Sequence, residues 1–484
     1  MSSNRKGISR REFLTRSAQT AAGVFVATAL TSCGVNQTAP AVSGRIIGAN
    51  DRINMAMIGI RSRGNAVAEE FAGIRNVRFK TLCDIDENLF PPRVKRIGEI
   101  QGYTPSTVVY DMRRVFEDKD IDAVAIGTPN HWHALATIWA CQAGKHVYVE
   151  KPCSHEIWEG RKMIEAARKY NRLVQVGFQN RSISNVRQAI KFLHDGELGD
   201  IYMARGLCFK PRGNIGRYPD GPMAKGEEFS STVGGNKETC YDSDYLKGVH
   251  YDLWLGPAPK RPFNRNRFHY NWHWQWDYGN GDIGNQGPHQ FDIARWGLNK
   301  NEHPVKIRSF GGYFGFTDSA QETPNTQSAT YKYADGKILQ FEVRGLDTNG
   351  EAEVKVGNLF FGSKGWMWIN GSEWKTYFGR KNEAGPSSTT TEAAADPMNL
   401  AGAGAGGHCN NFINALRSGK KEDLTCDIQT GYMSTVLPHL ANISYRLGRE
   451  VIFDGGQEKF TGDKEANCML TRKYREPYVV PERV

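Results

Sequence analysis

Short apolar runs alternate with amphipathic stretches along the chain that follows residue 50. The runs are rich in Val, Ile and Ala and end at turn residues, which is typical of buried strands. They lie at 52–60, 77–84, 121–129, 145–150 and 172–178. Between them, apolar residues recur with the period of a helix, most clearly at 131–144 and 155–170. Strands separated by helices of this length predict a parallel, doubly wound α/β sheet.

The pattern changes after the first third of the chain. Trp, Tyr and Gly become frequent, and apolar and polar positions alternate at 337–345 and 358–371. Such alternation is typical of strands with one buried face, so we expect a C-terminal α+β domain with a large, open and mostly antiparallel sheet. Residues 384–407 are of low complexity and are predicted to form a long surface loop. A helical region follows, from His408 to about Leu447.

These changes divide the chain into five predicted parts. They are a leader (1–33), a linker (34–50), the doubly wound domain (51–178), the second domain (179–450) and a C-terminal extension (451–484). A chain of 484 residues exceeds what a single hydrophobic core usually supports, which agrees with two folded domains.

The leader has the pattern of an export signal. Basic residues precede an apolar stretch at 18–30 that is too short to span a bilayer. The segment SRREFL (9–14) matches the twin-arginine signal, which exports folded proteins. The segment LTSC (30–33) is similar to a lipoprotein cleavage box, so Cys33 is a candidate for lipidation. We therefore expect a protein of the periplasm or cell envelope, anchored to the membrane through Cys33; the alternative is a short anchor that is never cut.

Charge and cysteine spacing argue against two classes of partner. The net charge of +10 is spread along the chain without a long basic run, which argues against nucleic acid. The nine cysteines include no C-x-x-C pair, so no zinc site is expected. His131 and His133 are two residues apart, and on a helix this spacing points them to different faces. No metal site is therefore expected at these histidines either.

The turn after the first strand has the composition of a phosphate-binding loop. Its sequence, GIRSRG (59–64), keeps Gly59 and Gly64 of the G-x-G-x-x-G pattern and carries Arg61 at the middle glycine. Such glycines let main-chain N–H groups approach a pyrophosphate at a helix N-terminus. Asp84, at the end of the second strand, can accept both hydroxyls of an adenosine ribose and would repel a 2′-phosphate. We therefore interpret this domain as a Rossmann domain that binds NAD; NADP is the alternative, because Arg61 could lie beside such a phosphate.

A lysine stands at the end of another strand of the same domain. The segment VYVEKPCSH (147–155) ends an apolar run and places Lys151 directly before Pro152. Proline removes a ladder donor and pushes the preceding residue out of the helical region, so Lys151 is held extended at the strand's carboxyl end. The segment TPNHWH (128–133) follows a neighbouring strand, at the edge where open α/β sheets bind ligands.

Three segments together resemble the Gfo/Idh/MocA family, which includes glucose–fructose oxidoreductase and inositol dehydrogenase. They are TPNHWH (128–133), EKP (150–152) and GDIGNQGPHQFDIARWGL (281–298), and the resemblance covers about 52–450. It implies an NAD(P)-dependent oxidoreductase whose cofactor lies across the Rossmann domain and whose second domain presents a sugar or polyol. The segment at 251–264 is similar to exported bacterial members in which a loop leads toward the active site.

The resemblance also implies roles for single residues. Lys151 would contact both cofactor and substrate hydroxyl and would stabilise developing charge on oxygen. The expected cofactor contacts are Gly59, Arg61, Ser62, Arg63, Gly64, Asp84, Thr128, Pro129, Asn130, His133, Glu150, Lys151 and Gln179. The expected substrate contacts are Arg181, Trp274, Trp276 and Asp292. A homo-oligomer that assembles through the second-domain sheet is expected as well.

The family pairs this lysine with a D-x-x-x-H motif whose histidine is the general base. In this chain Asn285 occupies the aspartate position and His289 the histidine position. Histidine titrates near neutrality and suits proton transfer, whereas Asn285 removes an anion that would stabilise the imidazolium. We expect Asp292 to face the same way on the helix and to supply part of the missing charge. The alternative for His289 is a structural histidine of the core.

The segment YNWHWQWDYGNG (270–281) spaces three tryptophans as on one face of a strand. On this interpretation Trp272, Trp274 and Trp276 stack on the C–H surfaces of a sugar. The alternative is that these side chains belong to the packed core of the second domain.

Three functions remain open from the sequence. The first is an exported oxidoreductase that transfers a hydride between a carbohydrate carbinol carbon and a tightly bound nicotinamide. The second is an NAD-dependent glycoside hydrolase or lyase that oxidises a sugar hydroxyl transiently, eliminates the glycosidic bond and returns the hydride. The third is a non-catalytic, sugar-binding surface lipoprotein, which Arg61 and Asn285 favour as departures from the family pattern.

Overall fold

A computed structural model describes most of the chain beyond the leader and linker. The described residues are 48, 51–222, 229–233, 236–241, 247–371, 373–388 and 405–484. The chain divides into two compact units, Met1–Ala41 and Val42–Val484, and all described residues belong to the second. The predicted export signal, Cys33 and most of the predicted 384–407 loop lie outside the described residues. No described helix is both long and apolar enough to cross a membrane.

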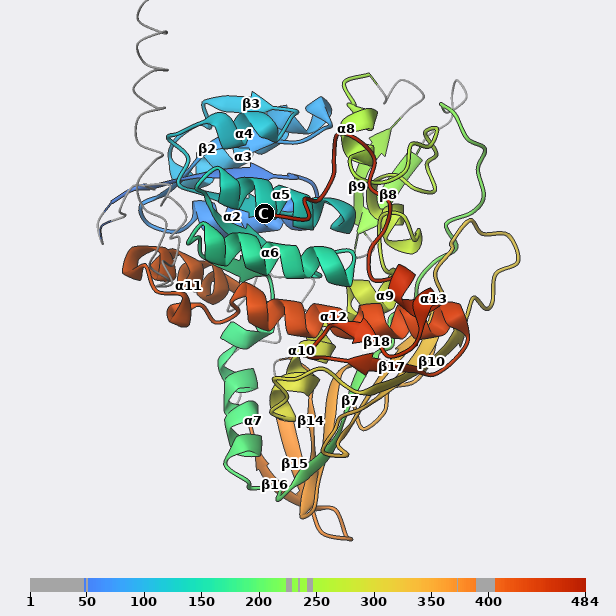
Figure 1. Ribbon diagram of the computed structural model, residues 1–484. Coiled ribbons are helices and arrows are strands. Elements are labelled where there is room, and N and C mark those ends of the chain that lie inside the picture. The colour runs from blue at the N-terminus through green and yellow to red at the C-terminus, as the bar shows by residue number, and fades with distance from the viewer. Residues whose placement is uncertain are drawn as a thin grey trace, which may run out of the picture. The chain divides into compact units, whose positions relative to one another are not determined.

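The first sheet has six parallel strands in the order β3-β2-β1-β4-β5-β6. The strands are β1 (Ile53–Ile58), β2 (Val77–Cys83), β3 (Thr107–Val109), β4 (Ala123–Ile126), β5 (His146–Val149) and β6 (Val174–Val176). The helices that connect them are η1 (Glu87–Leu89), α2 (Arg63–Ala72), α3 (Phe90–Gln101), α4 (Arg113–Glu117), α5 (Asn130–Gln142) and α6 (Ile157–Lys169). The doubly wound parallel sheet predicted from the apolar runs is confirmed (Figure 1).

The second sheet has ten strands in the order β16-β15-β14-β13-β7-β12-β11-β10-β17-β18. They are β7 (Ile201–Cys208), β10 (Lys306–Gly312), β11 (Thr326–Lys332), β12 (Ile338–Arg344), β13 (Val356–Gly362), β14 (Gly365–Ile369), β15 (Trp374–Phe378), β16 (Glu383–Ser387), β17 (Val451–Asp454) and β18 (Lys459–Phe460). Only the β7–β12 pair among these neighbours is parallel, so the mostly antiparallel sheet is confirmed. A separate hairpin pairs β8 (Phe229–Val233) with β9 (Asn236–Tyr241).

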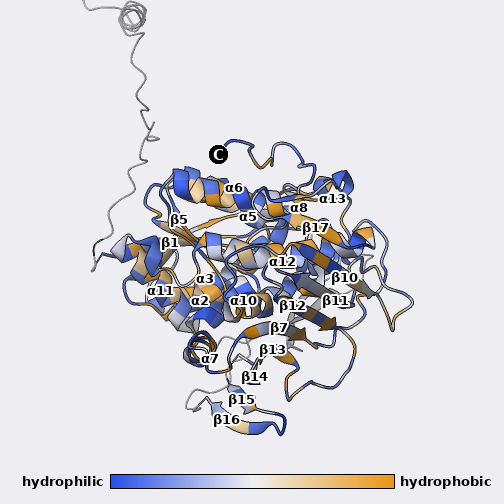
Figure 2. Ribbon diagram, turned by 60° about the horizontal axis from the view of Figure 1, so that its bottom comes forward, coloured by the Kyte–Doolittle hydropathy of each residue, from blue (hydrophilic) through white to orange (hydrophobic). Residues whose placement is uncertain are grey.

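Helix α12 of the second domain lies against both sheets. The described helices that follow the first sheet are η2 (Gln179–Ser182), α7 (Ser184–His194), α8 (Tyr251–Leu255), η3 (His269–Trp274), α9 (Gly281–Asn285), α10 (Gly287–Gly297), α11 (Ala405–Ser418), η4 (Lys421–Asp423), α12 (Ile428–Leu447) and α13 (Lys464–Cys468). Helix α12 contacts α6 and β6 on one side and α10 and β10 on the other. Figures 1 and 2 show α10 and α12 between the first sheet and the strands of the second.

Two domain assignments and one predicted strand differ from the sequence interpretation. β17, within the predicted C-terminal extension, pairs with β10 and so belongs to the second sheet. Helix α11, assigned to the second domain, packs on the first: the ring of Phe412 lies 6.0 Å from those of Phe71 and Tyr148. The strand predicted around Trp272 is wrong, because His269–Trp274 form a 3₁₀ helix.

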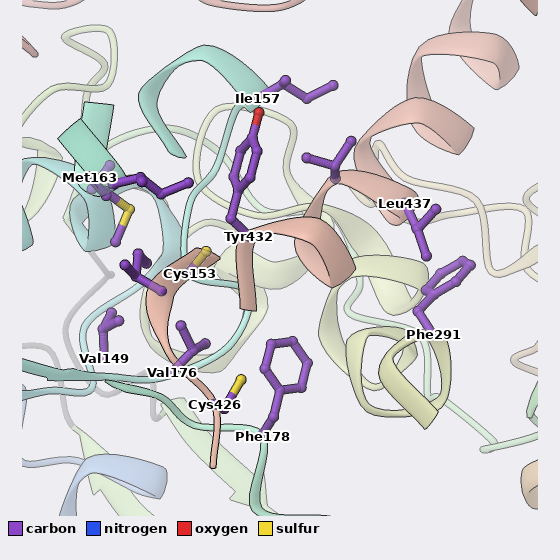
Figure 3. Close-up of a cluster of buried hydrophobic side chains, with 14 of the residues drawn as sticks. Val149, Cys153, Ile157, Met163, Val176, Phe178, Phe291, Cys426, Tyr432 and Leu437 are labelled. Atoms are coloured by element: carbon purple, nitrogen blue, oxygen red, sulfur yellow. The ribbon is translucent and has the colours of Figure 1, made fainter. Parts of the chain in front are cut away.

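One cluster of buried side chains joins the two domains. Figure 3 shows Val149 and Val176 of the first sheet, Tyr432 and Leu437 of α12, and Phe291 of α10 in this cluster. All five have at most 1% of their surface exposed. Truncating one large buried aromatic to Ala typically costs about 3–5 kcal/mol, so this packing resists movement between the sheets. The cluster therefore holds the carboxyl ends of the first sheet in a defined position against α9 and α10.

Candidate active site

A cleft of about 330 Å³ lies at the carboxyl ends of the first sheet. The turns that follow β1, β2, β4 and β5 form its first-domain wall. The opposite wall is formed by Trp254 of α8, by Asn285 and His289 at the α9–α10 junction, and by Phe268, His269, Tyr270, Trp272 and His273. Open α/β sheets bind ligands at this edge, so the location agrees with the sequence interpretation.

The turn after β1 has the shape of a dinucleotide site. Gly59 has a φ of 84°, and a β-carbon on Gly64 would come within 1.9 Å of the carbonyl oxygen of Gly59. Both positions therefore require glycine. Arg61, Ser62 and Arg63 line the cleft here, and α2 begins at Arg63. The N-terminal N–H groups of α2 thus lie at the cleft, which fits a pyrophosphate.

Asp84 lines the cleft at the end of β2. Its carboxylate accepts hydrogen bonds from the main-chain N–H groups of Ile60, at 2.8 Å, and Asp86, at 3.0 Å. Burial raises the pKa of Asp84 to about 6, an effect that these two hydrogen bonds oppose. An acidic group at this strand end fits the ribose of an adenosine. Arg61 lines the same part of the cleft, as the NADP alternative requires.

The turn between β4 and α5 presents polar atoms without partners. Thr128, Pro129 and Asn130 line the cleft. The hydroxyl oxygen of Thr128 and the amide oxygen of Asn130 are buried and lack a hydrogen-bond partner among the described residues. The ring nitrogens of His133 lie 2.8 Å from the carbonyl oxygen of Thr128 and 2.7 Å from that of Pro152. His133 therefore ties this turn to the segment that carries Lys151, and the orphaned oxygens fit a polar ligand.

A buried hydrogen-bond network holds Glu150 next to Lys151, the candidate catalytic residue. Its carboxylate accepts hydrogen bonds from Nε of Arg63 and Nε2 of Gln179, both at 2.9 Å. Burial raises the pKa of Glu150, but the positive charges of Arg63 and Lys151 outweigh it and bring the pKa below its ordinary value. Arg63 and Glu150 line the cleft, whereas Gln179 is not among the described residues that do so. Arg63 therefore neutralises Glu150, in addition to any contact with a cofactor.

Lys151 crosses the cleft to the second domain. Its ammonium group donates a hydrogen bond to the main-chain carbonyl oxygen of Asn285 at 2.8 Å. Burial lowers the pKa of Lys151 to about 8; Glu150 opposes this shift, and Arg63 adds to it. The side chain is thus a cation at neutral pH that can also lose its proton under mildly alkaline conditions.

His289 and Asn285 line the same cleft, from α10 and α9. Burial lowers the pKa of His289 well below its ordinary value, and the charge of Lys151 acts in the same direction. The imidazole is therefore neutral at physiological pH and able to accept a proton. Nδ1 of His289 and the amide nitrogen of Asn285 are buried without a hydrogen-bond partner among the described residues.

Asp292 does not supply the missing charge to His289. Its carboxylate receives two hydrogen bonds from the guanidinium of Arg181, at 2.7 and 2.8 Å, and one from the hydroxyl of Ser434, at 2.6 Å. Neither Arg181 nor Asp292 is among the described residues that line the cleft. These partners in η2 and α12 hold the Asp292 carboxylate outside the described lining of the cleft, so the predicted compensation is wrong.

The aromatic residues of the cleft differ from those predicted. Trp272 lines it, whereas Trp274 and Trp276 are absent from its described lining. Trp274 is 3% exposed and packs against the guanidinium of Arg212, and Trp276 packs against that of Arg446. A 3₁₀ helix brings residues three apart onto one face, so strand spacing selected the wrong tryptophans.

Five aromatic residues of the second domain line the cleft but were not predicted individually, His269 among them. The others are Trp254, Phe268, Tyr270 and His273. Tyr270 and His273 lie on one face of the 3₁₀ helix, with ring centroids 4.6 Å apart. Their Y-x-x-H spacing was the available signal, and the 251–264 resemblance pointed to the region of Trp254.

Known proteins match this chain in both domains. Residues 53–178 match a family described as an oxidoreductase family with an NAD-binding Rossmann fold. Residues 235–480 match the C-terminal alpha/beta domain of the same oxidoreductase family.

Curated relatives match a shorter part of the chain. A glycosyl hydrolase family 109 protein of Shewanella sp. (strain W3-18-1) is 29% identical over 171 residues, covering 34% of this chain and 37% of the relative. A levoglucosan dehydrogenase of Pseudarthrobacter phenanthrenivorans is 38% identical over 127 residues, covering 26% of this chain and 31% of the relative. The chain thus matches about a third of the length of these relatives.

Solved structures share the fold over most of the chain. A levoglucosan dehydrogenase in complex with NADH and levoglucosan has a TM-score of 0.57 at 18% identity, covering 85% of this chain and 99% of its own. The WlbA dehydrogenase from Bordetella pertussis, in complex with NADH and UDP-GlcNAcA, has the same TM-score and identity, covering 84% and 99%. Likeness at this identity shows the fold, and the two domain matches show the family. The chain belongs to the Gfo/Idh/MocA oxidoreductase family, with an NAD-binding Rossmann domain at its N-terminal side.

Proposed function

We propose that the protein oxidises or reduces a carbohydrate or polyol hydroxyl with a tightly bound NAD, using Lys151 and His289 as acid–base groups. The observation that carries this proposal is their convergence. Lys151 comes from the first domain and His289 from the second, and both line the cleft that the glycine turn also lines. A proton acceptor and a cation at one edge of a nucleotide site suit the oxidation of an alcohol.

The bound nicotinamide would supply the hydride acceptor or donor. On the protein side, the ammonium of Lys151 would orient the reacting hydroxyl and stabilise charge as it develops on oxygen. Neutral His289 would accept the hydroxyl proton. The main-chain carbonyl oxygen of Asn285 would position Lys151. Because the Asn285 side chain carries no charge, it would not raise the pKa of His289 as an aspartate would.

The candidate cofactor groups divide by chemistry. Main-chain N–H groups of the 59–64 turn would receive the pyrophosphate, and Asp84 would receive the ribose hydroxyls. Thr128 and Asn130, with their orphaned oxygens, would contact the nicotinamide half. The Arg61 side chain is the feature that favours NADP. Measuring the binding affinities of NAD and NADP decides between the two cofactors.

A glycoside hydrolase or lyase is the second candidate. The relatives named glycosyl hydrolase family 109 proteins, and one named alpha-N-acetylgalactosaminidase, favour it. In that reaction His289 or Lys151 would also remove the proton next to the oxidised carbon, which expels the glycosidic oxygen. Water then adds and the hydride returns, so the products carry no net oxidation.

One experiment separates these functions. Protein purified with its bound dinucleotide is incubated with free sugars and with aryl glycosides, and cofactor absorbance and released aglycone are both followed. Stoichiometric reduction of the cofactor by free sugars supports the oxidoreductase, and catalytic aglycone release without net reduction supports the hydrolase. If neither occurs with any sugar, the third alternative, a non-catalytic binding protein, replaces both.

Export and assembly remain proposals that rest on other parts of the chain. The paired arginines and the LTSC box support export by the twin-arginine route and a lipid anchor at Cys33. For assembly, the face of the second sheet away from α10 and α12 carries Phe310 and Ile452, which are 59% and 47% exposed. Exposed apolar side chains on an open sheet face support a homo-oligomer formed there.

A further inference from the structure

The C-terminal segment, defined as residues 470–484, contacts both domains beside the cofactor cleft. Figure 1 shows it leaving α13, running beside α8 and ending next to α5. Arg472 donates hydrogen bonds to the carbonyl oxygens of Asp277, at 2.8 Å, and His131, at 3.2 Å. The ring of Tyr478 lies 5.3 Å from that of Trp132. The segment therefore joins α5 of the Rossmann domain to loops of the second domain.

Arg475 is the part of this segment that holds α8. Its Nη1 donates to the carboxylate of Asp252 at 2.8 Å, and its Nη2 donates to the carbonyl oxygen of Asp252 at 2.7 Å. Its Nε donates to the carbonyl oxygen of Gly256 at 2.8 Å, and its main-chain N–H donates to that of Pro257 at 3.2 Å. One arginine thus holds both ends of the short α8 helix, and charged donors make these bonds stronger than neutral ones.

The segment that Arg475 holds lies across the cleft. We define residues 247–257 as the cover segment. Its carbonyl oxygen at Trp254 accepts hydrogen bonds from Nε2 of His131, at 2.8 Å, and Nε1 of Trp132, at 3.1 Å. At its other end the main-chain N–H of His250 donates a hydrogen bond to the carbonyl oxygen of Ile85, at 2.8 Å, and Ile85 follows Asp84 directly in the chain. The cover segment therefore spans from the β2 end to α5, with Trp254 facing the cleft.

This span covers the side of the cleft where the adenosine would lie. Asp84, Ile85 and Tyr110 line that side, and the ring of His250 stacks on Tyr110 with centroids 3.7 Å apart. Trp254 also packs on Tyr278, at 4.7 Å between centroids. Of these rings Tyr110 and Trp254 line the cleft, so an adenosine bound at Asp84 would lie beside side chains that the cover segment holds in place.

We propose that Arg475 is a positioning residue that holds the cover segment closed and thereby sets the rate at which the dinucleotide leaves. Arg475 does not line the cleft and acts through Asp252 and Trp254. With Arg475 in place the cofactor stays bound between turnovers, which agrees with the tightly bound NAD of the proposed function. The proposal concerns NAD binding alone and holds whether the reaction is oxidation or cleavage.

The test is the dissociation rate of NADH from the full-length protein, measured by fluorescence after addition of excess NAD. Arg475→Ala should release NADH roughly 10- to 100-fold faster, since several charge-assisted hydrogen bonds are lost. Arg475→Lys should fall between Arg475→Ala and the parent, because one cation remains but the planar fork is lost. Trp254→Ala should also release NADH faster, with the C-terminal contacts intact.

The matched control is Arg449→Ala, which removes another paired arginine. Arg449 bonds Asp463 and Glu465 and is absent from the described cleft lining. Its variant should release NADH at the parental rate, even where its unfolding temperature falls. Parental release rates in Arg475→Ala and Arg475→Lys would overturn the proposal. Should Arg475→Ala fail to fold, parental release from Arg475→Lys together with Trp254→Ala would overturn it equally.

Discussion

The ammonium group of Lys151 donates a hydrogen bond to the main-chain carbonyl oxygen of Asn285, 2.8 Å away. This bond joins the end of β5 in the Rossmann domain to the end of α9 in the second domain. His289, four residues after Asn285, lines the same cleft. The acid–base pair is therefore assembled only when the two domains are packed together.

His289→Ala should lower turnover by about 10²–10⁴-fold while the dinucleotide stays bound, because a positioned general base contributes about that factor. Lys151→Ala should lose activity as well, and the purified variant should also contain less bound dinucleotide than the parent. Single-turnover cofactor reduction and the dinucleotide content of the purified protein are the two measurements. His194→Ala, on an exposed part of α7, is the control and should behave as the parent. Full activity in His289→Ala would show that another group takes the proton.

Activity should fall as pH rises through about 8, because Lys151 then loses the proton that stabilises charge on oxygen. Asn285→Asp places an anion beside both Lys151 and His289 and so raises both pKa values. The acidic limb of the pH–rate profile, set by His289, and the alkaline limb, set by Lys151, should therefore both move to higher pH. Asn285→Ser, which is uncharged, should leave the limbs in place. A profile that does not respond to Asn285→Asp would contradict the roles of both residues.

Arg63→Met should also move the alkaline limb to higher pH. Arg63 is a cation that lowers the pKa of Lys151 and neutralises Glu150, so its loss leaves Lys151 beside an unopposed anion. Breaking a buried pair typically costs about 3–5 kcal/mol, so the free energy of unfolding should fall as well. Arg63→Lys keeps the charge and should leave the limb near its parental position. If the alkaline limb lies at the same pH in Arg63→Met and Arg63→Lys, Arg63 acts on stability alone.

Asp84→Asn should weaken NAD binding by roughly 10- to 100-fold, the range expected for losing hydrogen bonds to a charged group. It should also reduce any preference for NAD over NADP, since the anion that repels a 2′-phosphate is gone. Calorimetry with both cofactors is the measurement, with Arg61→Ala as the companion variant. If Asp84→Asn binds NAD as the parent does, Asp84 is not at the ribose.

Export should depend on the paired arginines of the leader. Arg10→Lys together with Arg11→Lys should retain the protein in the cytoplasm, because the twin-arginine route reads that pair. Cell fractionation followed by immunoblotting is the measurement. Cys33→Ala should leave export intact and release the protein from the membrane fraction. Efficient export of the double lysine variant would indicate another route.

The sequence alone determined the strand–helix order of the Rossmann domain and the positions of Gly59, Asp84 and Lys151. Each of these depends on a local cause: apolar periodicity, the φ angle that glycine permits, or the restriction that Pro152 imposes on Lys151. Such causes act over a few neighbouring residues, so they can be read without knowledge of the fold.

Only the tertiary structure decided which side chains that are far apart in the sequence meet, and which of them reach the cleft. Asp292 was expected beside His289, but it pairs with Arg181, 111 positions away along the chain. Trp272 rather than Trp274 reaches the cleft, because the segment winds into a 3₁₀ helix. Arg475 holds Asp252, 223 positions away. Residues so far apart meet only through the packing of the two sheets around α10 and α12, and no local pattern in the sequence records that packing.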